Sequence, residues 1–310
     1  MEERIVSFEH NGSVYGTITK PAAKEKLAAI LILPGSGPLD RNGNKGRIKL
    51  NLYNQLAEEL SKLGYVTFRY DKRGTGKSPE NFLKVGFWDL VEEGKAALEF
   101  LKDQPFVDEH KLFIIGHSEG AMIAPAVAKH ESLAGVILLA GAAETLHEAL
   151  LSQRKQVVDA LNNLGGLKGK LLQLINVTKK IEKQGSKFDQ KMLEAKKDVI
   201  RIQGARVNAK WFKEHYEYNV REVLQHIKCP VLAVTGSKDL QVTPEKVHDI
   251  HELVQTESEA VVIPNMNHIL RHQEEDYSIL QIKKAYKGSG EKPISPQFIE
   301  AINSWLSRYA

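Results

Sequence analysis

The chain has 310 residues, of which 42% are hydrophobic and 26% are charged, and its formal net charge is +4. This composition is ordinary for a soluble globular protein and argues against a disordered or fibrous chain. Nucleic-acid binders usually carry a stronger and more clustered basic excess, so we expect no nucleic-acid partner.

The N-terminus, the length of the apolar runs and the one cysteine bear on location. Met1-Glu2-Glu3-Arg4 contains no apolar stretch of a signal peptide, and no apolar run approaches the roughly 20 residues that span a bilayer. Cys229 is the only cysteine, so no intrachain disulfide can form. We therefore expect a cytoplasmic protein without stable membrane insertion.

The first elements are short β-strands. Two β-type runs flank Asn11-Gly12 and predict a hairpin. Short runs rich in Val and Ile follow, typical of strands buried on both faces of a parallel sheet. These runs are Ala28–Leu33, Tyr65–Tyr70, Leu112–Ile115, Gly135–Leu139, Val231–Val234 and Ala260–Ile263.

Amphipathic stretches with helical spacing separate the strands. They are Leu52–Leu63, Phe87–Leu101, Ala121–Lys129 and Pro244–Leu253, and Ser295-Pro296 opens a last helix to Tyr309. Alternating strands and helices predict an α/β fold, with a mostly parallel sheet covered by helices on both faces.

Residues 143–224 break this alternation. They hold leucine-rich patches but no convincing strand, and 16 basic against 10 acidic residues, which we interpret as a solvated helical face. We predict a mostly helical insertion of about four helices, with the main domain formed by residues 1–142 and 225–310. Arg271–Pro293 reads as a surface loop.

The sequence Gly116-His117-Ser118-Glu119-Gly120 lies directly between a predicted strand and a predicted helix. Gly-x-Ser-x-Gly in this setting is typical of a sharp turn that exposes a nucleophilic serine, whereas five matching residues alone would be weak evidence. Ser118 is therefore the candidate nucleophile.

Two residues that follow later strands are candidates for the acid and the base. Asp239 follows Val231–Val234, and His268 follows Ala260–Ile263, so both should lie at the same sheet edge as Ser118. Asp239 could instead be a simple turn residue, and His272 is the main competing base.

A glycine-containing loop, Gly35-Ser36-Gly37, follows the first long strand run. The backbone N–H groups of Ser36 and Glu119 are candidates for an oxyanion hole, although a plain turn would look the same. Gly35, Gly37 and His117 are expected to lie beside the substrate.

Two glycine motifs do not indicate a cofactor. Gly74–Ser78 lacks the first glycine of a phosphate-binding loop, where Asp71 stands, and Asp40 stands in the last glycine position of a dinucleotide fingerprint. No cluster has metal-ligand spacing, so we expect neither metal nor cofactor.

Taken together, these segments and Asp71–Ser78 resemble the α/β-hydrolase superfamily, and in particular bacterial carboxylesterases related to serine aminopeptidases and monoacylglycerol lipases. The resemblance implies an eight-stranded sheet, a Ser118–Asp239–His268 triad and a cap formed by residues 143–224. Pro34 departs from the pattern, because many relatives have His there, but a backbone donor at Ser36 does not depend on it.

The expected activity is hydrolysis of small-molecule carboxylic esters with short to medium acyl chains, by a monomer or homodimer. An aminopeptidase or amidase with the same triad is the alternative enzyme, and it would need a cap carboxylate such as Glu214, Glu217 or Glu222. A non-catalytic small-molecule-binding protein is the alternative from another class.

Overall fold

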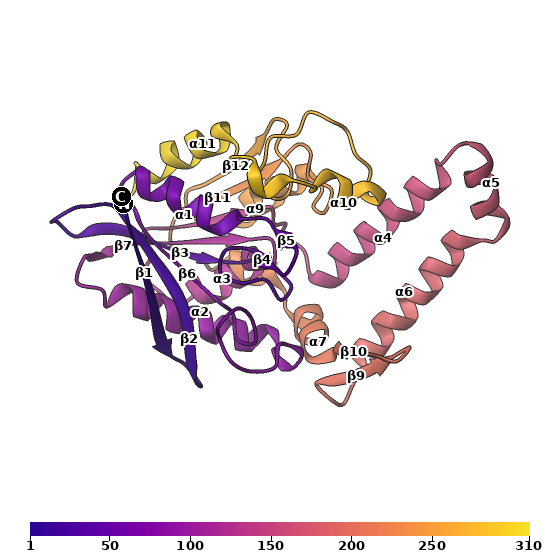
Figure 1. Cartoon of the computed structure of the whole chain (residues 1–310), viewed down its shortest axis with the longest axis horizontal. Coiled ribbons are helices and arrows are strands. Elements are labelled where there is room, and N and C mark those ends of the chain that lie inside the picture. Colours follow the sequence, from indigo (N-terminus) through magenta and orange to yellow (C-terminus); the bar gives the residue numbers. More distant parts are fainter.

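The computed structural model describes the backbone of residues 1–310 and all side chains except those of Lys168, Lys170 and Gln173. Its centre is an eight-stranded sheet in the order β1-β2-β6-β3-β7-β8-β11-β12 (Figure 1). β1, β2 and β6 pair antiparallel, and the strands from β6 to β12 pair parallel. The strands are β1 (Glu2–Glu9), β2 (Ser13–Lys20), β3 (Leu27–Leu33), β6 (Val66–Tyr70), β7 (Val107–His117), β8 (Gly135–Leu139), β11 (Val231–Gly236) and β12 (Ser258–Ile263).

The sheet confirms the predicted mostly parallel α/β architecture, and every predicted strand run lies in it. Helices cover both faces, with α1 and α11 on one side and α2 and α3 on the other (Figure 1). The helices that cover the two faces are α1 (Leu52–Lys62), α2 (Phe87–Lys102), α3 (Glu119–Ala128), α9 (Val247–Leu253) and α11 (Pro296–Leu306).

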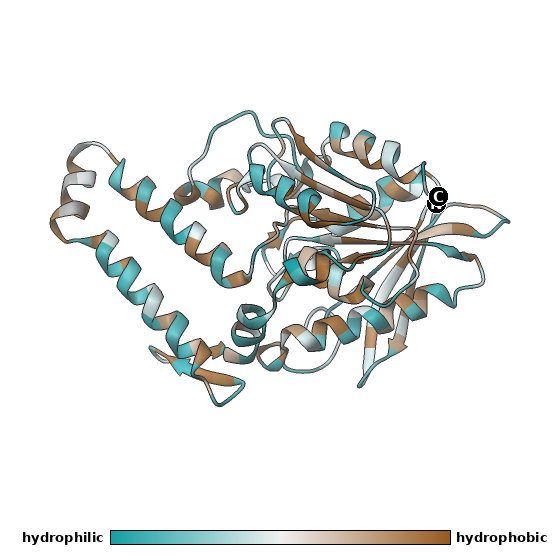
Figure 2. Ribbon diagram, turned by 180° about the vertical axis from the view of Figure 1, so that it is seen from behind, coloured by the Kyte–Doolittle hydropathy of each residue, from teal (hydrophilic) through white to brown (hydrophobic). Residues whose placement is uncertain are grey.

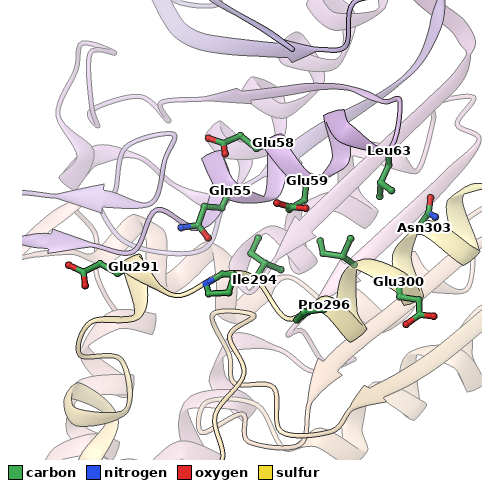
Figure 3. A pocket seen from close by; sticks show the side chains of 11 residues that line it. Gln55, Glu58, Glu59, Leu63, Glu291, Ile294, Pro296, Glu300 and Asn303 are labelled. Atoms are coloured by element: carbon green, nitrogen blue, oxygen red, sulfur yellow. The ribbon is translucent and has the colours of Figure 1, made fainter.

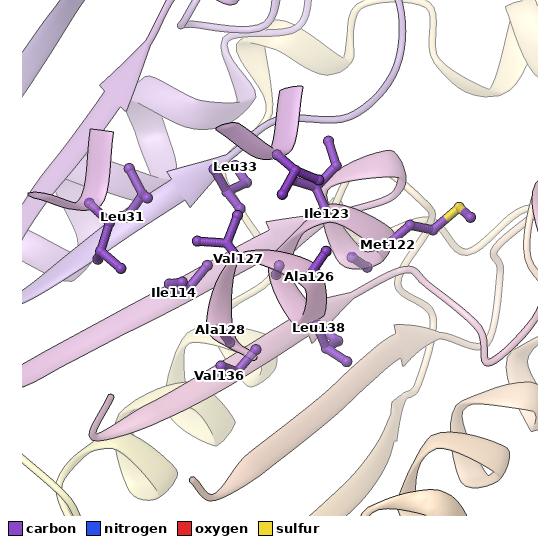
Figure 4. Close-up of a cluster of buried hydrophobic side chains, with 14 of the residues drawn as sticks. Leu31, Leu33, Ile114, Met122, Ile123, Ala126, Val127, Ala128, Val136 and Leu138 are labelled. Carbon is purple, nitrogen blue, oxygen red and sulfur yellow. The ribbon is translucent and has the colours of Figure 1, made fainter. Parts of the chain in front are cut away.

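Each central strand divides its side chains between two cores, because successive residues of a strand point to opposite faces. Ile30 and Ile32 of β3 pack with α1 and α11, whereas Leu31 and Leu33 pack with α2 and α3. Figure 4 shows the second core around α3, all of whose residues are buried. Burying each large aliphatic side chain contributes about 1.5–3 kcal/mol, which holds the start of α3 firmly against the sheet.

Between β8 and β11 the chain forms a helical arm that projects away from the sheet (Figure 1). α4 and α6 pack side by side, α5 joins them at the far end, and Leu167 and Leu174 of α5 are exposed. α7 and α8 return the chain to the sheet, where α8 packs on α3. The elements are α4 (Leu146–Asn162), α5 (Gly166–Leu174), α6 (Val177–Leu193), β9 (Val199–Ile202), β10 (Ala205–Asn208), α7 (Ala209–Glu217) and α8 (Val220–Leu224).

The expectation that this segment holds no strand is wrong. β9 and β10 form an antiparallel hairpin, in which Ile202 pairs with Ala205 across Gln203 and Gly204. Both turn residues have positive φ, 49° and 82°, as a two-residue hairpin turn with the twist of the strands requires. Gln is an unusual residue at the first of these positions, which hid the turn from the sequence analysis.

The remaining elements are short. The predicted loop Arg271–Pro293 contains three brief helical turns, so it is more ordered than expected. None of the helices in the described part of the chain is long and apolar enough to cross a bilayer. In Figure 2 the central strands are mostly hydrophobic and the outer helix faces mostly hydrophilic. The short elements are β4 (Asn44–Lys45), β5 (Ile48–Lys49), η1 (Phe82–Lys84), η2 (Pro244–Lys246), η3 (Ile279–Gln281), α10 (Ile282–Ala285) and η4 (Ser289–Glu291).

Candidate active site

Ser118 occupies a strained turn between β7 and α3, with φ 55° and ψ −114°. The turn is tight enough to require glycine on both sides. A Cβ on Gly120 would lie 2.2 Å from the carbonyl oxygen of Leu33, and one on Gly116 would lie 2.1 Å from that of Gly120. The Ser118 N–H donates to the Leu139 carbonyl at 2.8 Å, which anchors the turn to β8. The surrounding structure thus holds a backbone conformation that a free chain would avoid.

The structure brings Ser118, His268 and Asp239 into one hydrogen-bonded line. His268 Nε2 lies 3.2 Å from Ser118 Oγ, and His268 Nδ1 lies 2.9 Å and 3.1 Å from the two carboxylate oxygens of Asp239. The competing base, His272, has a half-exposed side chain and instead faces Glu274, with Nε2 3.6 Å from its carboxylate.

Asp239 is fixed by its own loop. Its Oδ1 accepts from the backbone N–H groups of Gln241 at 2.8 Å and Val242 at 3.0 Å. Gly236 lets this loop approach the one that carries His268, since a Cβ there would lie 1.9 Å from the Met266 carbonyl oxygen. The ends of β11 and β12 therefore place the carboxylate against the imidazole with little freedom to rotate.

A cavity of about 160 Å³ opens beside Ser118, and Ser36, Glu119 and His268 are among its lining residues. Neither the Ser36 N–H nor the Glu119 N–H donates to a backbone carbonyl in the part of the chain that the structure describes. Both are therefore available to an oxygen of a bound molecule. The remaining wall is largely apolar, and comprises Met122, Ala140, Gly141, Ala142, Leu146, Ala149, Leu150, Trp211 and Val242, with Glu144, Gln153, His215 and Gln241 as the polar members.

His117 lies behind this cavity and is not among its lining residues, and neither are Gly35 and Gly37. The Gly35 N–H donates to the Tyr53 hydroxyl at 2.7 Å, and this hydroxyl lies 3.0 Å from His117 Nδ1. His117 Nε2 lies 2.8 Å from the backbone carbonyl of His268, to which only an N–H can donate. Tyr53 and His117 thus connect the loop around Ser36 with the loop that carries the predicted base.

Burial keeps the imidazole ring of His117 uncharged. Loss of solvent, together with the neighbouring imidazole of His268, lowers the pKa of His117 to about 3. The neutral ring donates from Nε2 and accepts at Nδ1, which is the pattern that its two partners require.

Glu119 carries a buried cluster of charges that the sequence analysis missed. Its Oε2 accepts from Lys72 Nζ at 2.9 Å, and its Oε1 accepts from Trp211 Nε1 at 2.5 Å. Burial opposes ionisation, but the charge of Lys72 and the nearby His215 outweigh it and lower the pKa of Glu119 to about 2. A lysine two residues after the end of the buried strand β6 was the one sequence signal for this cluster.

A larger concavity than the cavity beside Ser118 lies elsewhere on the described surface. It measures about 700 Å³ and lies between α1 and the start of α11 (Figure 3). Its lining contains Glu58, Glu59 and Glu300 but no serine, cysteine or histidine, so it offers no nucleophile–base pair. Within the described residues, no group of three or more His, Cys, Asp or Glu side chains is arranged to hold a metal ion.

Comparison with known proteins identifies the family of the chain. A family model described as "Serine aminopeptidase, S33" matches residues 48–276. The chain belongs to this family of α/β-hydrolases. It is 26% identical to esterase EstD of Thermotoga maritima over 294 residues, which cover 94% of this chain and 65% of EstD, so it spans about two thirds of that relative.

Solved structures share the fold at low identity. Est1E from Butyrivibrio proteoclasticus, with ferulic acid bound, is 17% identical with a TM-score of 0.61, covering 96% of this chain and 95% of its own. An esterase from Thermogutta terrifontis is 18% identical with a TM-score of 0.57, and the match covers 100% of this chain and 99% of the esterase chain. These likenesses establish the α/β-hydrolase fold.

Proposed function

We propose that this chain is a cofactor-independent carboxylesterase that acts through an acyl-enzyme on Ser118. The observation that carries the proposal is the 3.2 Å approach of His268 Nε2 to Ser118 Oγ beside a cavity with two available N–H groups. A hydroxyl within hydrogen-bond reach of a base, which a carboxylate orients in turn, is the arrangement that activates a serine.

The acylation step follows from these positions. Ser118 Oγ bonds to the ester carbonyl carbon while its proton passes to His268 Nε2. The carbonyl oxygen becomes an anion and accepts from the N–H groups of Ser36 and Glu119. The tetrahedral intermediate collapses, the bond to the alcohol oxygen breaks, and His268 gives its proton to that oxygen. Asp239 holds the imidazole in the required orientation throughout.

Deacylation repeats the sequence with water. His268 takes a proton from water as the oxygen attacks the acyl carbon, and the same two N–H groups donate to the carbonyl oxygen as it becomes negative. Collapse returns the proton to Ser118 Oγ and releases the carboxylic acid.

The cavity supports small esters as substrates. Its volume of about 160 Å³ lies below the roughly 300–1,000 Å³ that encloses drug-sized ligands, and most of its wall is apolar. We therefore propose short acyl chains, with acetate to butyrate preferred over decanoate.

Recognition of an ammonium group has less support. Glu119 and Glu144 are the two carboxylates in the cavity lining, and each is already paired with a lysine, Lys72 and Lys246 respectively. The cap carboxylates considered for an aminopeptidase, Glu214, Glu217 and Glu222, are not among the lining residues. An amine would meet no unpaired anion, so the ester is favoured over the aminoacyl amide.

The decisive experiment is hydrolysis of p-nitrophenyl esters from acetate to decanoate by the wild type and Ser118→Ala, with exposed Ser304→Ala as control. Ser118→Ala should lose on the order of 10⁶ in turnover, and Ser304→Ala should lose nothing. Undiminished hydrolysis by Ser118→Ala would refute the proposal. Aminoacyl anilides cleaved faster than ethyl esters would favour the aminopeptidase. A folded protein that no fluorophosphonate labels would favour the binding protein.

A further inference from the structure

Lys72 lies between the two segments that supply the candidate oxyanion donors. Its side chain is almost fully buried, and Nζ donates to the Gly35 carbonyl at 2.8 Å and to Glu119 Oε2 at 2.9 Å. Lys72 itself is not among the residues that line the cavity, so the lysine acts from behind the donors.

The contact with Gly35 fixes the direction of one donor. The Gly35 carbonyl and the Ser36 N–H belong to one planar trans peptide unit, in which the C=O and N–H bonds point in opposite directions. A cation that holds the carbonyl oxygen on the protein side therefore turns the N–H toward the opposite side. The positive charge also polarises this peptide unit, which strengthens the N–H as a donor.

The contact with Glu119 fixes the other donor. Glu119 is the first residue of α3, and its backbone N–H is the second candidate donor. Its side chain is buried, and its other oxygen accepts from Trp211 Nε1 of α7 at 2.5 Å. His215 Nε2, also on α7, lies 3.2 Å from the same oxygen but without the alignment of a hydrogen bond.

We propose that Lys72 and Glu119 form a positioning pair that aligns both oxyanion donors, and that Trp211 makes this alignment depend on the docking of α7. Lys72 and Trp211 are positioning residues and touch no reacting atom in the proposed reaction. The inference deepens the proposed function and rests on it. α7, which supplies Trp211 and His215 to the cavity wall, thereby also helps to align the two N–H groups of the proposed oxyanion hole.

Trp211→Phe tests the link to α7, because it removes one N–H donor and keeps an aromatic ring. Losing an oxyanion donor costs about 10²–10³ in turnover, so misaligning the donors should lower kcat by about 10- to 100-fold, with KM changed little. Lys210→Met is the matched control on the same helix, because its partly exposed ion pair with Asp89, at 2.6 Å, contributes little to the docking of α7 and does not touch Glu119. It should keep the wild-type kcat.

Two inhibitors separate alignment from simple contact with the substrate. An alkylboronic acid adds to a serine hydroxyl to form a tetrahedral anion, whereas the matching carboxylic acid binds without that change. Trp211→Phe should weaken the boronic acid in proportion to the loss in kcat and leave the carboxylic acid unaffected. If both inhibitors weaken equally, or neither does, Trp211 only lines the cavity and the proposal is overturned.

The lysine is tested with its partner neutralised. Lys72→Met alone leaves a buried carboxylate without its cation and is expected to fold poorly. The double variant Lys72→Met/Glu119→Gln removes both charges, and it should fold yet lose kcat and boronic-acid affinity together. A folded double variant with wild-type kcat would contradict the role of Lys72.

A readout independent of turnover distinguishes this inference from the proposed function. In ¹⁵N-labelled protein, the amide resonances of Ser36 and Glu119 should shift in Trp211→Phe and in the double variant, and stay in place in Lys210→Met. If the wild type neither hydrolyses esters nor binds the boronic acid, the proposed function fails while the amide shifts still test the alignment. Unchanged resonances in an active enzyme would overturn the inference alone.

Discussion

The Nε2 atom of His117 lies 2.8 Å from the backbone carbonyl of His268, so the residue before the predicted nucleophile holds the main chain of the predicted base. This link crosses from the end of β7 to the loop after β12. It supports the position of the His268 imidazole from the backbone side, whereas Asp239 contacts the ring itself.

Because His117 must stay neutral in the fold, we expect it to make the protein sensitive to acid. The unfolded chain binds a proton near the ordinary histidine pKa of about 6.5, whereas the folded protein resists protonation until about pH 3. The contribution of His117 to stability should therefore fall as the pH falls, by on the order of 1 kcal/mol per pH unit between about pH 6 and pH 3.

The measurement is urea unfolding at several pH values, for the wild type and for His117→Gln. The variant should be less stable at pH 7 but lose less stability in acid. Glu93, whose pKa burial raises to about 7, acts in the opposite sense but contributes to both proteins alike. His110→Gln, at an exposed site, should keep the wild-type slope, and an equal slope in His117→Gln would contradict the prediction.

Asp239→Asn should lower kcat by about 10⁴-fold without changing the melting temperature greatly, because an amide in this place favours the wrong tautomer of the imidazole. Asp276→Asn serves as the control, since Asp276 pairs with Lys238 at the surface nearby and lies outside the hydrogen-bonded line. The measurement is ester turnover with thermal unfolding in parallel. A kcat near that of the wild type would remove Asp239 from the proposed mechanism.

Gly120→Ala should destabilise the fold by about 1–3 kcal/mol or more, because its Cβ would lie 2.2 Å from the Leu33 carbonyl oxygen. Gly165→Ala is the matched control, as a Cβ at that position meets nothing within 4 Å. Denaturant unfolding measures both. An unchanged midpoint for Gly120→Ala would show that β3 and α3 separate more easily than their packing suggests.

Leu150→Ala should widen the range of acyl chains that the enzyme accepts, because Leu150 lines the cavity beside Ser118. Each methylene in a hydrophobic pocket changes discrimination by about 10- to 200-fold, so the ratio of kcat/KM for hexanoate over acetate should rise at least tenfold. Leu151→Ala, on the exposed side of the same helix, should leave the ratio unchanged. A ratio that rises equally in both variants would mean that the arm has loosened as a whole.

The sequence predicts the sheet well because its strands are short, apolar and buried on both faces, a pattern that few other elements produce. The meeting of Ser118, Asp239 and His268 could also be predicted, since each follows a parallel strand and such ends share one edge.

Contacts that depend on how the arm docks could not be predicted. Nothing local in Trp211 or Lys72 shows that both reach Glu119, because these residues come from three separate segments. The same holds for Glu144, which the sequence analysis did not consider, although it is the carboxylate that joins Glu119 in the cavity lining.

The first turns of α4 form part of the wall above Ser118, through Leu146, Ala149, Leu150 and Gln153, while the far end of the same helix carries α5. A helix of 17 residues is a stiff rod of about 25 Å. A tilt of α4 that moved its distant end would therefore also move the side chains that form the cavity wall, and would change the volume beside Ser118.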